Sequence, residues 1–317
     1  MKFSLAIHGG AGTRRRDAMT AKDEAGYRAG LQRALLSGYG VLKESGSALE
    51  AVTRAVMALE DDRHFNAGRG AVYTAAGTHE MDAAVMEGRS RQAGAVAAIM
   101  GPRNPVLAAR AVMERSENVL LVGEGAMAFC REQELAFEDA EYFGTPERLE
   151  ALHAELERRR RKGADTRDDA ARHGTVGAVA RDGAGNLAAA TSTGGMTGKR
   201  PGRVGDCPVF GAGTWADENC AVSATGHGEI FIRYAAAHEI AARLRLGKQS
   251  FAAAAEAVVM ELGTRGGSGG LIGVDATGAV ALPFNCAGMY RGRIDADGIA
   301  WTGIYREPLE AHELSAA

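Results

Sequence analysis

Glycine interrupts this chain at short intervals, and 43 of the 317 residues are glycine. This is about twice the roughly 7% that is typical of globular proteins. Glycine loses more backbone entropy than any other residue when it is fixed in a helix or strand. A glycine content this high therefore indicates tight turns and close backbone approaches. The sequence therefore predicts many short elements joined by glycine turns.

The spacing of apolar residues separates expected helices from expected strands. Apolar residues recur every three to four positions in the expected helices, which are residues 18–42, 47–59, 105–116, 230–244 and 251–262. Short apolar runs mark the expected strands, which are residues 3–8, 71–74, 81–86, 93–100, 175–180, 187–193, 209–215, 220–225, 271–274, 279–283 and 290–304. Hairpins that enclose a pair of helices predict antiparallel sheets layered with helices.

The stretch from about residue 145 to 174 differs from the rest in composition. Residues 156–162 read Leu-Glu-Arg-Arg-Arg-Arg-Lys, and residues 165–172 carry almost no core side chains. A basic run of this kind could bind nucleic acid, but acidic residues surround it. We therefore expect a solvated helix end and a flexible linker.

Overall charge and motifs exclude several classes of protein. The net charge of −3 favours neither nucleic acid nor an acidic membrane surface, and no apolar stretch reaches the ~20 residues of a membrane span. The cysteines lack zinc-site spacing, and the histidines never pair as metal ligands. We expect no catalytic cofactor. Since the first apolar run is too short for a signal peptide, we expect a cytoplasmic protein.

A candidate nucleophile stands where the expected linker meets the next strand, in the sequence Gly174-Thr175-Val176. If the Gly174–Thr175 bond broke, Thr175 would carry both a hydroxyl and a free α-amine. The pKa of an α-amine is about 7.7–8.0, against about 10.4 for lysine. Near neutral pH this amine can accept the proton of its own hydroxyl, which is one established way to activate a threonine.

The hairpin that follows supplies a partner for Thr175. If its turn centres on Ala184, Thr175 falls opposite Thr193. Directly opposed residues have Cβ atoms about 4.5–5.5 Å apart, so the two hydroxyls would meet. The alternative is that both threonines are ordinary β-branched strand residues.

Two further clusters are complementary to an amino acid or its reaction. Arg203 and Asp206 lie three residues apart on a loop, where a guanidinium can bind a carboxylate and an aspartate can bind an ammonium. Residues 225–229 (Thr-Gly-His-Gly-Glu) end a strand, and backbone N–H groups there could form an oxyanion hole. The alternatives are a surface salt bridge and a simple helix-entry turn.

Together these motifs closely resemble the plant-type asparaginase/isoaspartyl peptidase family of N-terminal-nucleophile (Ntn) hydrolases, from about residue 3 to 307. The resemblance fails only in the expected linker. The matching segments are residues 7–12, 65–68, 81–83, 174–180, 190–195, 202–206, 225–229 and 266–272.

The resemblance implies an αββα sandwich, with two antiparallel sheets between helical layers, that is made as an inactive precursor. Cleavage at Gly174–Thr175 would give an α chain (1–174) and a β chain (175–317) that together form one domain. It implies hydrolysis of β-aspartyl dipeptides and L-asparagine to L-aspartate through a β-aspartyl ester on Thr175. Such enzymes are usually dimers of αβ units.

The resemblance also implies roles for individual residues. Thr175 would be the nucleophile and Thr193 would hold its amine and hydroxyl. Thr225 and Gly226 match oxyanion-hole positions, supported by Asn66. The remaining positions are the substrate-binding residues Arg203, Asp206, Gly226, His227 and Gly228, and a structural sodium loop that binds largely through backbone carbonyls, formed by Leu59, Glu60, Phe65, Ala67 and Arg69.

Two other functions remain open. One is a glycosylasparaginase-like hydrolase, although that branch usually has aspartate where this chain has Gly174. The other is a homologue that binds small amino acids without processing itself, which the presence of Thr175, Thr193 and Thr225 disfavours.

Overall fold

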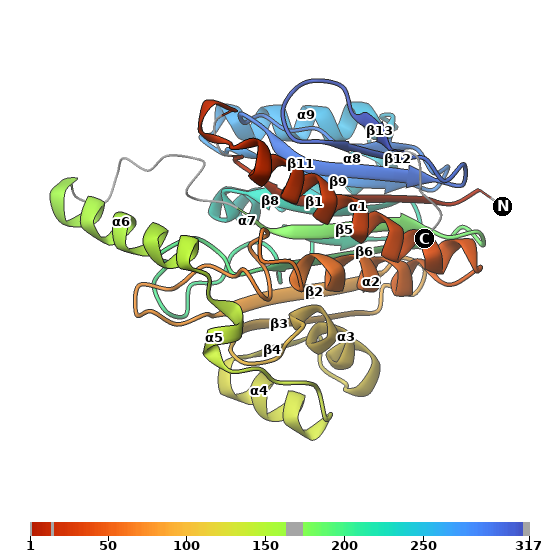
Figure 1. Cartoon of the computed structure of the whole chain (residues 1–317). Helices are drawn as coiled ribbons and strands as arrows, with labels where there is room; N and C mark the ends of the chain where they lie inside the picture. Colours follow the sequence, from red (N-terminus) through yellow and green to blue (C-terminus); the bar gives the residue numbers. More distant parts are fainter. Residues whose placement is uncertain (1, 14–15, 163–173, 313–317) are drawn as a thin grey trace.

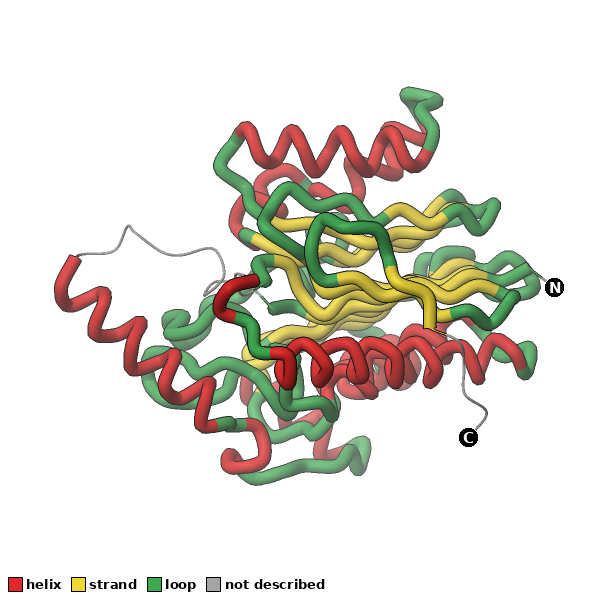
Figure 2. The backbone as a smooth tube through the Cα atoms, turned by 45° about the horizontal axis from the view of Figure 1, so that its top comes forward, coloured by secondary structure: helices red, strands yellow, loops and turns green. Residues whose placement is uncertain are grey.

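A computed structural model describes residues 2–13, 16–162 and 174–312 of the chain. Within these ranges two β-sheets pack face to face, and helices cover the outer face of each (Figures 1 and 2). The expected αββα sandwich is therefore confirmed.

The larger sheet contains, among the described residues, nine strands in the order β13-β12-β11-β1-β5-β6-β2-β3-β4. All neighbours are antiparallel except β3 and β4, which run parallel. The strands are β1 (Ser4–Ala11), β2 (Met81–Glu87), β3 (Ala93–Ile99), β4 (Leu120–Val122), β5 (Val176–Arg181), β6 (Leu187–Thr193), β11 (Met289–Asp295), β12 (Ala300–Gly303) and β13 (Glu310–His312).

The smaller sheet is formed by four strands in the order β10-β9-β8-β7, as far as the described ranges extend. These are β7 (Thr214–Ala216), β8 (Cys220–Gly226), β9 (Gly269–Asp275) and β10 (Val280–Ala281). Its outer face is covered by α7 (Gly228–Tyr234), α8 (Ala236–Arg245) and α9 (Phe251–Thr264). Small residues of β5 and β6 pack against β8 and β9, which brings the two sheets together.

The outer face of the larger sheet is covered mainly by α1 and α2, which begin at well-formed caps. The Thr20 and Ser47 hydroxyls accept hydrogen bonds from the amides of Asp23 and Glu50. None of the described helices has the length and apolar character needed to cross a bilayer. The helices of this half are η1 (Arg16–Ala18), α1 (Ala21–Lys43), α2 (Ala48–Glu60), α3 (Pro105–Arg115), α4 (Gly123–Glu132), α5 (Ala140–Phe143) and α6 (Pro146–Lys162).

The structure shows a helix in the first part of the linker that the sequence predicted over residues 145–174. Residues Pro146–Lys162 form the helix α6, and residues 163–173 lie outside the described part. Ion pairs along α6 compensate for its few apolar residues, because Glu155 binds both Arg158 and Arg159 at distances of 2.7–2.8 Å. The helix end expected from the composition is therefore part of a helix that begins earlier, at Pro146.

Two smaller expectations also differ. Residues 71–74 form no strand, although Thr74 makes an isolated bridge to Lys199. The single helix expected over residues 230–244 is interrupted at Ala235, whose left-handed backbone (φ 44°, ψ 48°) separates α7 from α8. Apolar spacing continues across this break, so periodicity alone could not locate it.

Candidate active site

The hairpin of β5 and β6 places Thr175 opposite Thr193, as the register prediction requires. Val176 pairs with Ser192, so the positions one residue before β5 and at the end of β6 face each other. The Thr175 hydroxyl donates to Thr193 Oγ1 at 3.2 Å, and the amide of Gly195 donates to the same oxygen at 2.9 Å. Thr193 thus fixes the direction of the Thr175 hydroxyl.

Gly174 lies in a space that admits no side chain. A Cβ atom on Gly174 would lie 2.7 Å from Asn66 Cβ, and one on Gly10 would lie 2.7 Å from Gly174 Cα. Asn66 in turn donates from Nδ2 to the Gly195 carbonyl at 2.7 Å. The residue before Thr175 is therefore enclosed between the Asn66 loop and the end of β1, and a larger residue would displace the chain at the expected cleavage site.

Arg203 and Asp206, which we call the clamp, line a narrow pocket together with Thr175, Thr193 and Gly226. Among the described residues they do not pair with each other, so the local salt bridge left open by the sequence is absent. The carboxylate that binds Arg203 is Glu229.

Glu229 holds the Arg203 guanidinium by two hydrogen bonds. Arg203 Nε lies 3.0 Å from Glu229 Oε1, and Nη2 lies 2.8 Å from Oε2. Such a bidentate pair fixes the plane of the guanidinium. A Cβ atom on Gly228 would lie 2.8 Å from Asp206 Oδ1 and 3.1 Å from Arg203 Nη2, so glycine at this position lets the clamp close in on the α7 N-terminus.

Asp206 is a deeply buried carboxyl group. Its Oδ2 atom has no hydrogen-bond partner within the described ranges. Burial raises the pKa of Asp206 to about 7, although the nearby Arg203 charge opposes this shift. A buried carboxylate with a free oxygen beside a narrow pocket is suited to bind a cation such as an ammonium group.

Thr225 is the penultimate residue of β8, and its side chain is fully buried. Its Oγ1 atom accepts a hydrogen bond from the Ala11 amide at 3.0 Å, so its own proton can be donated to another group. The next residue, Gly226, lines the pocket. His227 is not among the residues that line this pocket, and its Nε2 lies 3.6 Å from Glu229 Oε2.

Sequence reasoning assigned no role to His8 or Glu229, although both lie in motifs that it identified. His8 Nδ1 lies 3.0 Å from the Thr175 carbonyl oxygen and Nε2 lies 2.9 Å from Ser223 Oγ. A carbonyl only accepts, so Nδ1 carries the proton and Nε2 accepts from Ser223. Burial lowers the pKa of His8 to about 3, so a neutral imidazole anchors the backbone of Thr175.

The loop expected to bind sodium surrounds converging backbone oxygens. A Cβ atom on Gly70 would lie 2.6 Å from the Arg63 carbonyl oxygen and closer still to that of Phe65. Backbone oxygens of this kind suit a hard cation. The Glu60 side chain faces elsewhere, because Oε1 accepts from the Val106 amide at 2.9 Å at the start of α3. No cluster of three His, Cys, Asp or Glu side chains occurs within the described residues.

Comparison with known proteins agrees with this geometry. Residues 1–304 match the family described as Asparaginase. The isoaspartyl peptidase of Salmonella typhimurium is 53% identical over 96% of this chain and 99% of its own length, and that of Escherichia coli is 50% identical over 96% and 97%. The plant-type L-asparaginase of Thermococcus kodakarensis is 42% identical over 89% and 93%. This chain therefore belongs to the asparaginase family.

Proposed function

We propose that this chain is a self-processing threonine hydrolase that converts β-aspartyl dipeptides and L-asparagine to L-aspartate. The observation that carries the proposal is the position of Thr175. Its hydroxyl donates a hydrogen bond to Thr193 Oγ1 at 3.2 Å. Thr175 directly follows the enclosed Gly174 in the chain, and it lines the same pocket as Arg203 and Asp206. The names of the most similar relatives support the same substrates.

The first reaction is cleavage of the chain itself. Thr175 Oγ1 attacks the carbonyl carbon of Gly174, the peptide C–N bond breaks, and the hydroxyl proton passes to the departing nitrogen of Thr175. Water then hydrolyses the resulting ester. The products are an α chain of residues 1–174 and a β chain of residues 175–317, in which Thr175 has a free amine.

The second reaction repeats the attack on a substrate. The Thr175 amine takes the hydroxyl proton while Oγ1 bonds to the β-carbonyl carbon. The substrate C–N bond then breaks and the proton passes to the leaving amine. Water hydrolyses the β-aspartyl ester to release L-aspartate. The Thr225 hydroxyl and the Gly226 amide stabilise the negative charge on the carbonyl oxygen, while Thr193 and Asn66 position the reacting groups.

The clamp recognises the aspartyl half of the substrate. Arg203, oriented by Glu229, binds the α-carboxylate, and the free oxygen of Asp206 binds the α-ammonium. Gly226 and Gly228 line the space between them, and His227 lies at the rim beside Glu229.

The titration of Asp206 gives a prediction for substrate affinity. Only ionised Asp206 attracts an ammonium group, and its pKa is raised to about 7. We expect the inhibition constant of the product L-aspartate to rise about tenfold for each pH unit below 7 and to level off above it. Inhibition measured from pH 5.5 to 8.5 checks this. Asp206→Asn should bind weakly with no such slope; an unchanged slope in that variant contradicts the assignment.

Product analysis tests the proposed function. The denatured mass of purified protein should show two fragments, one of which begins at Thr175. This sample should release L-aspartate from a β-aspartyl dipeptide and from L-asparagine. Preferential action on glycosylated asparagine would favour the glycosylasparaginase alternative. A chain that stays intact and binds aspartate without turnover would instead indicate a non-processing homologue.

We also propose that the loop from Leu59 to Arg69 binds a structural sodium ion through backbone carbonyls, including those of Glu60, Phe65 and Ala67. Sodium that binds only the folded state should raise the melting temperature by about 3 °C or more, relative to choline chloride at equal ionic strength. Gly70→Ala should abolish this sodium-dependent increment, because its Cβ would occupy the space between the Arg63 and Phe65 carbonyls. Equal melting temperatures in both salts would contradict the site.

Location and assembly follow as expectations from this proposal. All four cysteines are buried and free, which suits the reducing cytoplasm. We propose that two αβ units form a dimer there, with neither nucleic acid nor a membrane as partner. Light scattering of the cleaved protein gives the assembly state.

A further inference from the structure

A second cavity of about 220 Å³ adjoins the Thr175 pocket. Gly174 and Asn66 lie in its wall, and Gly195 lines both spaces. In the uncleaved chain Gly174 therefore stands between the nucleophile and this cavity. Cleavage frees Gly174 from Thr175, and the two spaces can then become continuous.

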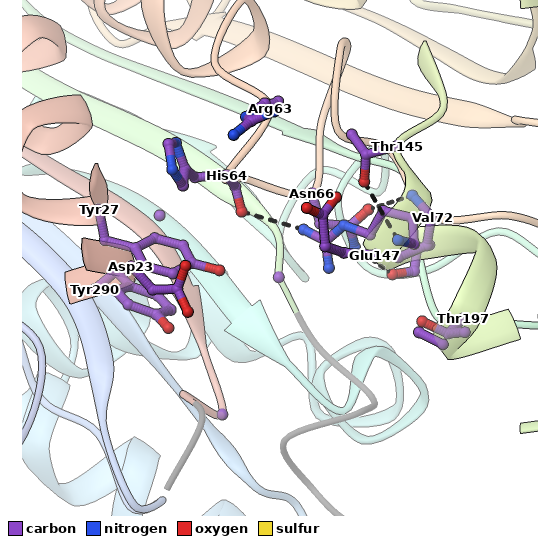
Figure 3. A pocket seen from close by; sticks show the side chains of 16 residues that line it. Asp23, Tyr27, Arg63, His64, Asn66, Val72, Thr145, Glu147, Thr197 and Tyr290 are labelled. Atoms are coloured by element: carbon purple, nitrogen blue, oxygen red, sulfur yellow. Dashed lines mark hydrogen bonds between the residues drawn. The ribbon is translucent and has the colours of Figure 1, made fainter. Parts of the chain in front are cut away.

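One side of the cavity is an aromatic wall of packed rings. Tyr27 of α1 and Tyr290 of β11 are stacked, with ring centroids 4.2 Å apart and planes inclined by 17°. The edge of the Phe65 ring packs on Tyr27 with centroids 5.7 Å apart. Figure 3 shows Tyr27 and Tyr290 together on one side, with Thr145 and Thr197 on the other. Such a wall can bury an apolar side chain without first becoming ordered.

Charged groups complete the lining. Asp23 and Glu147 are there, together with the cations Arg63 and Arg148. Arg148 donates to the carbonyls of Gly70 at 2.9 Å and His64 at 3.2 Å, so its place is fixed. Arg63 is exposed, and no carboxylate in the described part of the chain pairs with it. Arg63 is therefore the cation of this cavity that is available to an incoming carboxylate.

We propose that this cavity is the subsite for the leaving amino acid of β-aspartyl dipeptides; the inference rests on the proposed function. The clamp holds the aspartyl half, so the amine beyond the scissile bond must occupy another space beside Thr175. For asparagine that leaving group is ammonia, which needs no further contact. For a dipeptide it is a residue whose apolar side chain packs on Tyr27 and Tyr290 and whose carboxylate faces Arg63.

Three substrates separate these contacts: β-aspartyl-leucine, β-aspartyl-leucinamide, which lacks the terminal carboxylate, and L-asparagine. In Arg63→Gln we expect kcat/KM for β-aspartyl-leucine to fall about fivefold, as for one partly exposed ion pair. The preference for this substrate over its amide should disappear, while asparagine hydrolysis stays unchanged. Arg89→Gln is the matched control, since Arg89 is exposed and lies outside the cavity lining.

A second variant tests the aromatic wall. Tyr27→Leu should reduce the preference for β-aspartyl-leucine over β-aspartyl-glycine by about fivefold. The ratio of dipeptide to asparagine hydrolysis corrects for any loss of folded enzyme. The proposal is overturned if Arg63→Gln matches Arg89→Gln on every substrate, or if it lowers dipeptide and asparagine hydrolysis equally. A cleaved wild-type enzyme that hydrolyses none of these substrates would instead overturn the proposed function itself.

Discussion

Thr175→Ala is expected to give a single uncleaved chain of 33.1 kDa that hydrolyses neither β-aspartyl dipeptides nor asparagine. The variant has no hydroxyl to attack the Gly174 carbonyl, and no other nucleophile is hydrogen-bonded to Thr193 Oγ1 in the described structure. Loss of a nucleophile costs on the order of 10⁴-fold or more in rate. The intact mass of the denatured protein, followed over days, measures cleavage directly.

Thr175→Ser is the matched control for this variant, because serine keeps the attacking oxygen. We expect it to cleave between residues 174 and 175, more slowly than the wild type, and to retain measurable hydrolysis. If Thr175→Ala separated into the same two fragments, or if it turned over asparagine at the wild-type rate, Thr175 could not be the nucleophile.

Arg203→Ala is expected to lower kcat/KM by about 10²–10³-fold, mainly through a higher KM. The substitution removes the partner of the substrate carboxylate and also leaves Glu229, which Arg203 now binds at 2.8 and 3.0 Å, without its cation. Arg203 is largely buried, whereas the Glu229 side chain is 45% exposed, so we assign the loss to the pair that Arg203 forms with the substrate carboxylate; truncating one member of such a buried, hydrogen-bonded charge pair costs about 2–5 kcal/mol. Steady-state kinetics with asparagine and with one dipeptide measure the effect.

Arg243 offers a control, because it too binds a glutamate by two hydrogen bonds. It binds Glu261 through both terminal nitrogens on the helical surface, away from the Thr175 pocket. Arg243→Ala should leave kcat/KM within about twofold of the wild-type value.

Because Arg203 acts in substrate binding rather than in bond breaking, the Arg203→Ala variant should still cleave itself. An unchanged kcat/KM in Arg203→Ala would remove Arg203 from the clamp.

Much of what the sequence predicts about this fold and site depends on residues that lie close together along the chain. The turn around Ala184 fixes the hairpin, and strand pairing advances one residue at a time, so Thr193 was placed opposite Thr175 without any tertiary information. The start of α6 at Pro146 was missed because ion pairs such as Glu155 with Arg159 support this helix where apolar residues are few. The break at Ala235 was missed because it leaves the apolar spacing intact.

By itself, the sequence determined the layered fold, the family, and the identity and register of the threonine pair, because each depends on local pattern or on ordered motifs. Only the tertiary structure showed that Glu229 orients Arg203, that His8 anchors the Thr175 carbonyl, and that Tyr27 stacks on Tyr290 beside Gly174. These contacts join residues from separate elements of the sandwich. Their distances depend on how the two sheets and their helices pack, which no spacing along the chain encodes.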